Sequence, residues 1–355
     1  MRHDPPEVFC FRHLKGVARR PAPLFLLLWG AVCVVGVFAQ NAGSLTLGRQ
    51  YTRTFYDGEL EQLWAVMSDG LRKEQGSISG LSDFRRSVQE LVGRERRVLS
   101  ERVVAEGGQE VYVRRVMYER SAEPFDLRWA LDARGRIMDF SIRPSSPATQ
   151  FKYRTRARLR LPFEGEWYVA SGGRTPEQNG NHYYDYLLRF ANDFVRVEDT
   201  RFDRDANPPR NEDFAAFGRP VLAPGAGKVA LIRDGIPDNT PGRPNLNPRE
   251  RVGNYVVIDH GNGEYSLLAH LKVGSVKVRA GESVKAGQAV GACGNSGNSS
   301  GPHLHYGLHR AADPDKGMSV PAQFLHYFAD GKPVKRGEPL RGQKVRAAET
   351  KPEYE

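Results

Sequence analysis

Residues 301–305 read Gly-Pro-His-Leu-His, and a second short run, Ala-His-Leu, stands upstream at 269–271. One residue separates the two histidines of the first run, so on an extended segment both side chains point to the same face. A metal ligand and a second imidazole directed at the same reacting atoms need this placement. A chance pairing on a sheet surface is the alternative, because short motifs have a high false-positive rate.

The sequence before this run predicts short antiparallel strands. Residues 254–259 form an apolar run, residues 260–263 contain an Asn-Gly turn, and residues 265–271 form a second apolar run. This arrangement is typical of a β-hairpin. Glycines then punctuate the segment 281–297, as in a compact antiparallel roll. His303 and His305 are therefore expected on a strand of a β domain.

Taken together, the hairpin, the glycine-punctuated strands and the histidines of residues 254–309 closely resemble the lysostaphin/LytM-type zinc metallopeptidases. That family cuts peptide cross-links in bacterial peptidoglycan. The resemblance extends over residues 155–345 and implies a mostly β, antiparallel LytM-type peptidase domain. It also implies one zinc ion (Zn2+) per chain, held by three protein ligands with a fourth position open for water.

The family pattern implies that His305 is one zinc ligand and that an earlier histidine and an aspartate are the others. His182 is the natural first ligand, since it is the only histidine between the basic N-terminal segment, residues 1–20, and His260. His270 and His303 match the two active-site histidines of the family that do not bind the metal. The resemblance does not divide the roles of general base and oxyanion donor between them.

The aspartate ligand departs from the usual pattern. Most family members place it four residues after the histidine, whereas here Asp185 follows at three residues and Asp193 at eleven. Longer-looped members place it in an aromatic-Ala-x-Asp-Phe strand, which residues 190–194 match. A carboxylate in such an apolar strand is costly unless it is paired or bound to a cation. We therefore predict that Asp193, rather than Asp185, binds the zinc.

The remaining features around the expected site carry weaker hypotheses. Tyr306 and the loop 294–300 are expected to line a substrate groove, and the long insertion 234–251 to form one wall of it. His260 is expected to make structural hydrogen bonds. His309 shares the face of His303 but lies at the strand end, so it is expected to be exposed and without a role.

The N-terminus reads as an export signal. Basic residues lead into an unbroken apolar run at 24–38, and small or permissive residues precede Gln40. Residues 1–39 are therefore predicted to be a signal peptide, with an uncleaved N-terminal anchor as the alternative. The expected location is the periplasm or cell envelope. Only Cys293 would remain after cleavage, which excludes a fold based on disulfides.

Residues 45–143 predict a small α+β accessory domain. Two segments with helical periodicity, one with Ser82 as a candidate N-cap, precede alternating extended segments such as 125–131. This order resembles the cone of nuclear-transport-factor-like domains. Residues 144–154 are rich in Pro and Ser at their start and predict a linker, and residues 346–355 predict a polar tail.

The charge suits the expected substrate. The chain carries a formal charge of +10, and removing residues 1–39 takes away five positive and two negative charges and leaves +7. A basic exported protein suits anionic wall polymers. The expected partners are peptidoglycan peptide stems, without nucleic acid, and a membrane only through an uncleaved N-terminal segment. The sequence decides neither the oligomeric state nor which peptide bond is cut.

Two other functions fit parts of the sequence. A non-catalytic LytM-like protein would bind the wall or activate another hydrolase, although such relatives typically lose ligands that this chain keeps. A carrier domain of the biotinyl or lipoyl type is suggested by the glycine-flanked Lys285. That lysine lacks the usual neighbours of a modified residue.

Overall fold

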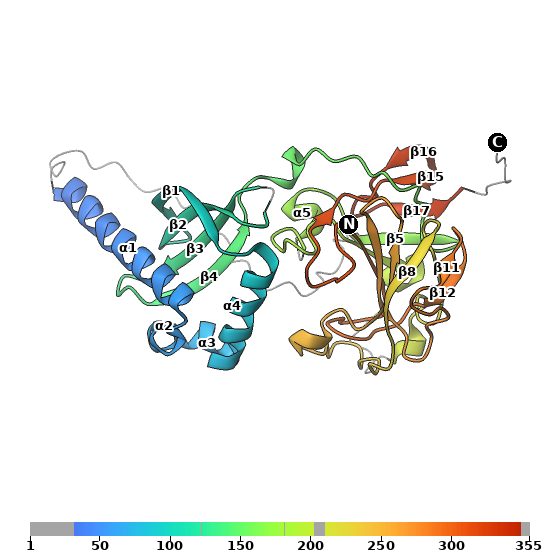
Figure 1. Cartoon of the computed structure of the whole chain (residues 1–355), viewed down its shortest axis with the longest axis horizontal. Coiled ribbons are helices and arrows are strands. Elements are labelled where there is room, and N and C mark those ends of the chain that lie inside the picture. Colours follow the sequence, from blue (N-terminus) through green and yellow to red (C-terminus); the bar gives the residue numbers. More distant parts are fainter. Residues whose placement is uncertain (1–31, 122, 181, 202–209, 349–355) are drawn as a thin grey trace. The chain divides into compact units, whose positions relative to one another are not determined.

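The computed structural model describes residues 32–121, 123–180, 182–201 and 210–348. The chain divides into two compact units, Met1–Ser146 and Pro147–Glu355, and the division falls inside the expected linker (Figure 1). Residues 1–31 of the predicted signal peptide lie outside the described residues. Within the described part, none of the helices combines the length and the apolar character that crossing a membrane requires.

The described residues of the N-terminal unit form four helices followed by four strands. The strands form one antiparallel sheet in the order β1-β2-β3-β4. The elements are α1 (Val32–Asp57), α2 (Leu60–Val66), α3 (Asp69–Gln75), α4 (Ile78–Val92), β1 (Glu95–Glu106), β2 (Gln109–Tyr118), β3 (Phe125–Leu131) and β4 (Ile137–Pro144). The predicted order of helices before an antiparallel sheet is confirmed, while the cone-like label stays a prediction.

Aromatic side chains join the helices of this unit to its sheet. The rings of Trp129 and Phe140, on neighbouring strands, stack with their centroids 3.9 Å apart, and Phe55 of α1 packs edge-on against Trp129. The predicted N-cap of α4 is wrong. Ser77 caps the helix by accepting a hydrogen bond from the Gly80 N–H, so α4 starts before Ser82.

The C-terminal unit is mostly antiparallel β-sheet. Its helical elements are short: η1 (Ala148–Gln150), α5 (Pro176–Asn179), η2 (Val197–Arg201), η3 (Asn211–Asp213) and η4 (Pro248–Glu250). Its strands are β5 (Glu166–Ser171), β6 (Asn192–Arg196), β7 (Pro220–Leu222), β8 (Gly227–Arg233), β9 (Asn254–Asp259), β10 (Tyr265–Leu271), β11 (Ser283–Val284), β12 (Ala289–Ala292), β13 (Leu304–His309), β14 (Ser319–Val320), β15 (Phe324–Ala329), β16 (Lys332–Gly337) and β17 (Lys344–Ala347).

The order of the strands brings distant sequence segments together. The main sheet runs β11-β8-β9-β10-β13-β6-β5-β17-β15-β16, with β14 paired to β13, and β7 pairs with β12 in a small second sheet. The predicted hairpin is confirmed as β9 and β10, which pair antiparallel. Strands β10 and β6 therefore lie on either side of β13, although 69 positions separate the end of β6 at Arg196 from the start of β10 at Tyr265.

Alternate side chains of β13 and β6 point to opposite faces, one facing the hydrophobic core and the other facing the candidate site. Leu304, Tyr306 and Leu308 of β13 belong to the main hydrophobic core, together with Phe194 of β6. Because successive side chains of a strand point to opposite faces, His305 and Asp193 face away from that core. The predicted polar tail begins too early, since Arg346 and Ala347 belong to strand β17.

Candidate metal centre

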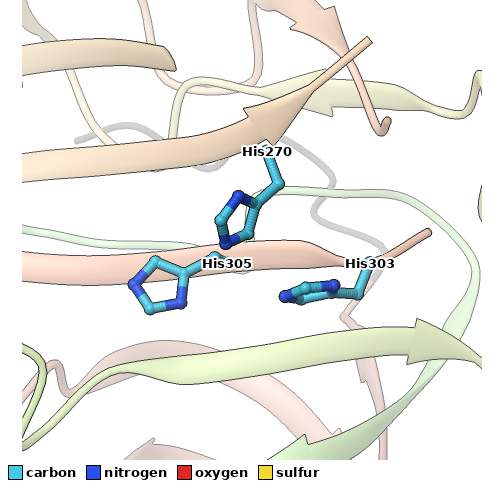
Figure 2. Close-up of side chains that lie close together, drawn as sticks. All are labelled: His270, His303 and His305. Atoms are coloured by element: carbon cyan, nitrogen blue, oxygen red, sulfur yellow. The ribbon is translucent and has the colours of Figure 1, made fainter. Parts of the chain in front are cut away.

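The five residues expected at the active site lie together in the C-terminal unit. Asp193 comes from β6, His305 from β13 and His270 from the end of β10, while His303 immediately precedes β13. His182 follows the short helix α5 in a turn. Figure 2 shows the imidazoles of His270, His303 and His305 converging on one space.

Asp193 lies at the centre of this group. It is directly opposite His305 in the β6–β13 ladder, and 2.9 Å separates Asp193 Oδ1 from His305 Nδ1. Its other oxygen, Oδ2, is 3.4 Å from His182 Nε2. One ligand atom from each of His182, Asp193 and His305 lies within 4.8 Å of the other two.

This geometry fits a zinc ion. Zinc bonds of about 2.0–2.1 Å to nitrogen and oxygen in a tetrahedron place neighbouring ligand atoms about 3.3 Å apart. The Asp193 carboxylate lies at similar distances from the two imidazoles, with 2.9 Å between Oδ1 and His305 Nδ1 and 3.4 Å between Oδ2 and His182 Nε2. The donor set of two imidazoles and one carboxylate is also one that catalytic zinc accepts.

The side chain of Asn179 fixes the orientation of His182. Its Nδ2 donates to the carbonyls of Arg189 and Ala191, so its Oδ1 is left to accept from His182 Nδ1 at 3.1 Å. With the proton on Nδ1, the lone pair of His182 Nε2 is available to a metal ion held beside Asp193. Sequence reasoning missed Asn179. The Asn-rich lead into His182 was the available signal.

Asp185 is held away from the centre. Its Oδ1 accepts a hydrogen bond from the Leu187 N–H, and its Oδ2 is 3.2 Å from the Arg251 guanidinium. It lies in a turn between α5 and β6, as expected, and its side chain is 39% exposed. The carboxylate nearer to the imidazoles is therefore that of Asp193.

The two remaining histidines are both oriented by carbonyl groups. His270 Nδ1 donates to the Ser296 carbonyl at 2.7 Å, and His303 Nδ1 donates to the Gly301 carbonyl at 2.9 Å. Each ring therefore keeps a lone pair on Nε2. The centroids of the two rings are 4.9 Å apart.

The backbone of His270 adopts a left-handed conformation, with φ of 58°. This region costs a non-glycine residue free energy and is found most often at functional sites. The His270 N–H donates to the Val252 carbonyl and its carbonyl accepts from the Gly294 N–H. Both backbone groups are paired, so the strained conformation is held by its surroundings.

The burial of the site controls its charges. Burial lowers the pKa of His182 to about 4 and lowers the pKa of His270 well below its ordinary value. Burial alone would raise the pKa of the Asp193 carboxyl, but the three facing imidazoles hold that pKa well below its usual range. At neutral pH the centre therefore contains the Asp193 carboxylate together with the neutral imidazoles of His182 and His270.

The loop 294–300 supports the histidines rather than lining a groove. Asn295, Ser296 and Ser299 are almost fully buried, and Ser296 and Ser299 hydrogen-bond to His270 and His303. Tyr306 is fully buried and its hydroxyl bonds to Ser266. The prediction that Tyr306 and this loop line the substrate groove is wrong for these four side chains.

The insertion 234–251 lies along the same loop. Asn239 donates from its side chain to the carbonyls of Gly297 and Ser299, and Gly242 N–H donates to the Ser300 carbonyl. The insertion thus braces the loop that orients the two histidines. Whether it forms one wall of a groove stays a prediction.

His260 agrees with the role predicted from the sequence, and His309 does not. His260 makes the expected structural hydrogen bonds, with 2.9 Å between Nδ1 and the Ala226 carbonyl oxygen and 2.8 Å between Nε2 and Ser266 Oγ. The expectation that His309 is exposed is wrong, because only 1% of its surface is accessible. Strand β14 and the Gly317 backbone cover the end of β13, which the sequence pattern did not reveal.

A second ligand set also exists within this cluster. His270, His303 and His305 place one nitrogen each within 4.8 Å of one another. This set lacks a carboxylate, so nothing in it offsets the charge of a divalent ion. The set with Asp193 supplies that negative charge.

The sequence was compared with known proteins. The model of peptidase family M23 matches residues 210–316, which include His270, His303 and His305. Peptidoglycan DD-endopeptidase ShyA of Vibrio cholerae serotype O1 is 32% identical over 146 residues, which cover 41% of this chain and 30% of that protein. ShyC of the same organism, also named a peptidoglycan DD-endopeptidase, is 32% identical over 143 residues, 39% of this chain and 31% of that protein. The chain thus spans about a third of the length of these relatives.

Solved structures of this type were also found. The catalytic domain of the M23 protein EnpA from Enterococcus faecalis covers 46% of this chain and 94% of its own, at 21% identity and a TM-score of 0.30. A zinc-containing peptidase from Vibrio cholerae covers 68% of this chain and 63% of its own, at 19% identity and a TM-score of 0.28. The family assignment rests on the sequence matches. The C-terminal unit contains a domain of peptidase family M23, the lysostaphin/LytM type.

Proposed function

We propose that this protein is a zinc-dependent endopeptidase that hydrolyses peptide cross-links of bacterial peptidoglycan. The observation that carries the proposal is the convergence of two imidazoles and one carboxylate at metal-binding distances beside two further imidazoles with free Nε2 atoms. A metal-assisted hydrolase needs both parts: ligands that leave a coordination position open, and groups that move protons next to it.

In this proposal the metal is held by His182 Nε2, an oxygen of Asp193 and His305 Nδ1. When bound, zinc supplies a Lewis acid that polarises the scissile carbonyl and acidifies water. Asn179 keeps His182 in the tautomer that binds metal. The antiparallel pairing of β6 with β13 holds Asp193 and His305 at a fixed separation, which favours a preorganised site.

His270 and His303 carry the proton transfers. Both rings keep Nδ1–H on a backbone carbonyl, so only Nε2 is free to accept a proton from the attacking water. An imidazolium formed in this way becomes a donor to the developing oxyanion or to the leaving amine. The division of these two roles between the rings stays open.

The substrate class rests on the relatives. Two of them, each about a third identical over the matched segment, are named peptidoglycan DD-endopeptidases. Export is part of the proposal, since peptidoglycan lies outside the cytoplasm, and the basic leader with its apolar run supports it. The formal charge of +7 left after residue 39 suits an anionic wall.

Mass analysis of released muropeptides tests this function. Purified protein is incubated with isolated peptidoglycan, with a chelator, and with the chelator followed by added zinc. We expect cross-linked muropeptides to be cut in the first and third samples only. Intact cross-links in all three samples, with folded protein that holds zinc, would favour a non-catalytic wall-binding protein.

A further inference from the structure

The second ring nitrogen of His305 is an unexplained feature of the metal centre. His305 Nδ1 faces Asp193, so in the proposed site Nδ1 gives its lone pair to the metal and the ring proton stands on Nε2. Ligating histidines almost always donate that second N–H to a partner, as His182 does to Asn179. Among the residues that the structure describes, His305 Nε2 is buried and has no hydrogen-bond partner.

His309 presents the complementary group. Its Nδ1 is 3.1 Å from the carbonyl oxygen of Gly317, which can only accept, so the ring proton stands on Nδ1. His309 Nε2 then carries a lone pair. Within the described part of the chain this atom too is buried and has no partner. One buried donor and one buried acceptor are thus both left unpaired, and a buried polar group without a partner destabilises the folded protein.

Strand β13 brings the rings of His305 and His309 toward each other. His305, Gly307 and His309 alternate along β13, so they share one face. A Cβ added at Gly307 would lie 2.5 Å from His309 Nε2, which means that the His309 ring leans over Gly307. In Figure 2 one nitrogen of the His305 ring lies on the side away from His270 and His303.

We propose that His309 is a positioning residue for the metal, and that His305 Nε2–H donates to His309 Nε2 through one bridging water. This inference rests on the proposed zinc site and adds a residue to it. A single water between the two rings satisfies both unpaired atoms. The contact holds His305 in the tautomer whose Nδ1 binds metal. Residue 307 must be glycine in this proposal, because a side chain there would occupy the space between the His305 and His309 rings.

Two matched substitutions separate this role from packing. Asn in place of His309 keeps a donor near Nδ1 for the Gly317 carbonyl but lacks an acceptor near Nε2. Gln reaches the position of Nε2 with an acceptor. The zinc dissociation constant of the full chain is measured by competition with a chromophoric chelator, and the absorption spectrum of the cobalt form reports the ligand geometry.

We expect H309N to weaken zinc binding by about 10–100-fold and to change the cobalt spectrum, and H309Q to stay within about threefold of wild type. G307A is expected to behave like H309N, because its Cβ displaces the His309 ring. H260L removes a histidine just beyond the end of β9 whose two nitrogens already have partners, and it should not change zinc affinity.

The outcomes are distinguishable. If the wild-type chain binds no zinc, the proposed function fails. If wild type binds zinc and H309N, H309Q and G307A all bind it equally well, the role of His309 is overturned while the proposed function stands. Equal losses in H309N and H309Q would show that His309 acts by packing alone, and would also overturn the inference.

Discussion

His305 and Asp193 stand directly opposite each other on neighbouring antiparallel strands, with 2.9 Å between Nδ1 and Oδ1. A cross-strand pair of this kind fixes a separation between two side chains that lie 112 positions apart in the chain. The other members of the centre are arranged around it: His182 approaches the second oxygen of Asp193, and His303 Nε2 is 3.5 Å from the first.

Loss of either His270 or His303 should separate catalysis from metal binding. Replacing either residue by Ala removes a proton acceptor but none of the proposed ligands. We expect each variant to keep about one zinc per chain and to lose turnover by on the order of a hundredfold or more. Metal analysis and muropeptide release check this. Loss of zinc in H303A together with retention in H305A would reverse the assignment of the pair.

Removal of the Asn179 amide should weaken the metal site without touching a ligand. N179A leaves His182 Nδ1 without its acceptor, so the tautomer that binds metal is no longer enforced. We expect zinc affinity to fall by about 10–100-fold. The exposed Asn247, whose side chain accepts a hydrogen bond from the Arg249 N–H, provides a control of the same type. Equal zinc affinity in N179A, N247A and wild type would contradict the role.

The N-terminal unit should not be needed for chemistry. Residues 45–143 contain no histidine and no cysteine, and the chain divides after Ser146. A fragment that begins near Ala148 should still cut a soluble cross-linked muropeptide, although its binding to intact wall is expected to be weaker. A folded, zinc-loaded fragment without any activity would indicate a composite site.

The stability of the N-terminal unit should depend on Glu101 in acid. Burial raises the pKa of this carboxyl, but hydrogen bonds from Arg49, Tyr112 and Arg114 outweigh it and lower the pKa from 4.5 to about 2. The stabilising contribution is therefore complete above pH 4.5 and is lost as the pH falls toward 2. With allowance for solvent screening, E101Q should lower the free energy of unfolding by about 1–2 kcal/mol at pH 7. Near pH 2, where the carboxyl of the wild-type protein is protonated, the substitution should change the free energy of unfolding little.

A control for this prediction is E106Q. The Glu106 side chain is 53% exposed where it pairs with Arg128, and exposed ion pairs contribute little. Thermal unfolding of both variants at pH 7 and near pH 2.5 makes the comparison. A difference in unfolding temperature between E101Q and wild type that grows as the pH falls would contradict the prediction.

Local patterns predicted much of the fold and of the site. The hairpin of β9 and β10, strand β3 and the strand around Asp193 follow from short-range alternation and turn residues, which the sequence displays directly. The four histidine positions came from the family pattern, and Asp193 came from the longer-looped variant of that pattern and from the cost of an unpaired carboxylate in an apolar strand. Their convergence depends on the pairing of β6 with β13, a contact that no local pattern encodes.

The burial of His309 and of Tyr306 could not be predicted for the same reason. Their neighbours along the chain are ordinary strand residues, and the groups that cover or pair with them, at Gly317 and Ser266, come from other strands and turns. Asn179 was missed because its function depends on which way its amide faces. Two carbonyls from the chain beyond His182 decide that orientation.

The most direct test of the account is the zinc content of two aspartate variants. Asp193 is proposed to hold the metal, whereas Asp185 is engaged by Arg251. Purified D193A and D185A, each shown to be folded, are compared with wild type for bound zinc and for cleavage of peptidoglycan cross-links. We expect D193A to lose both zinc and activity and D185A to keep both. Zinc and activity retained in D193A but lost in D185A would contradict this assignment.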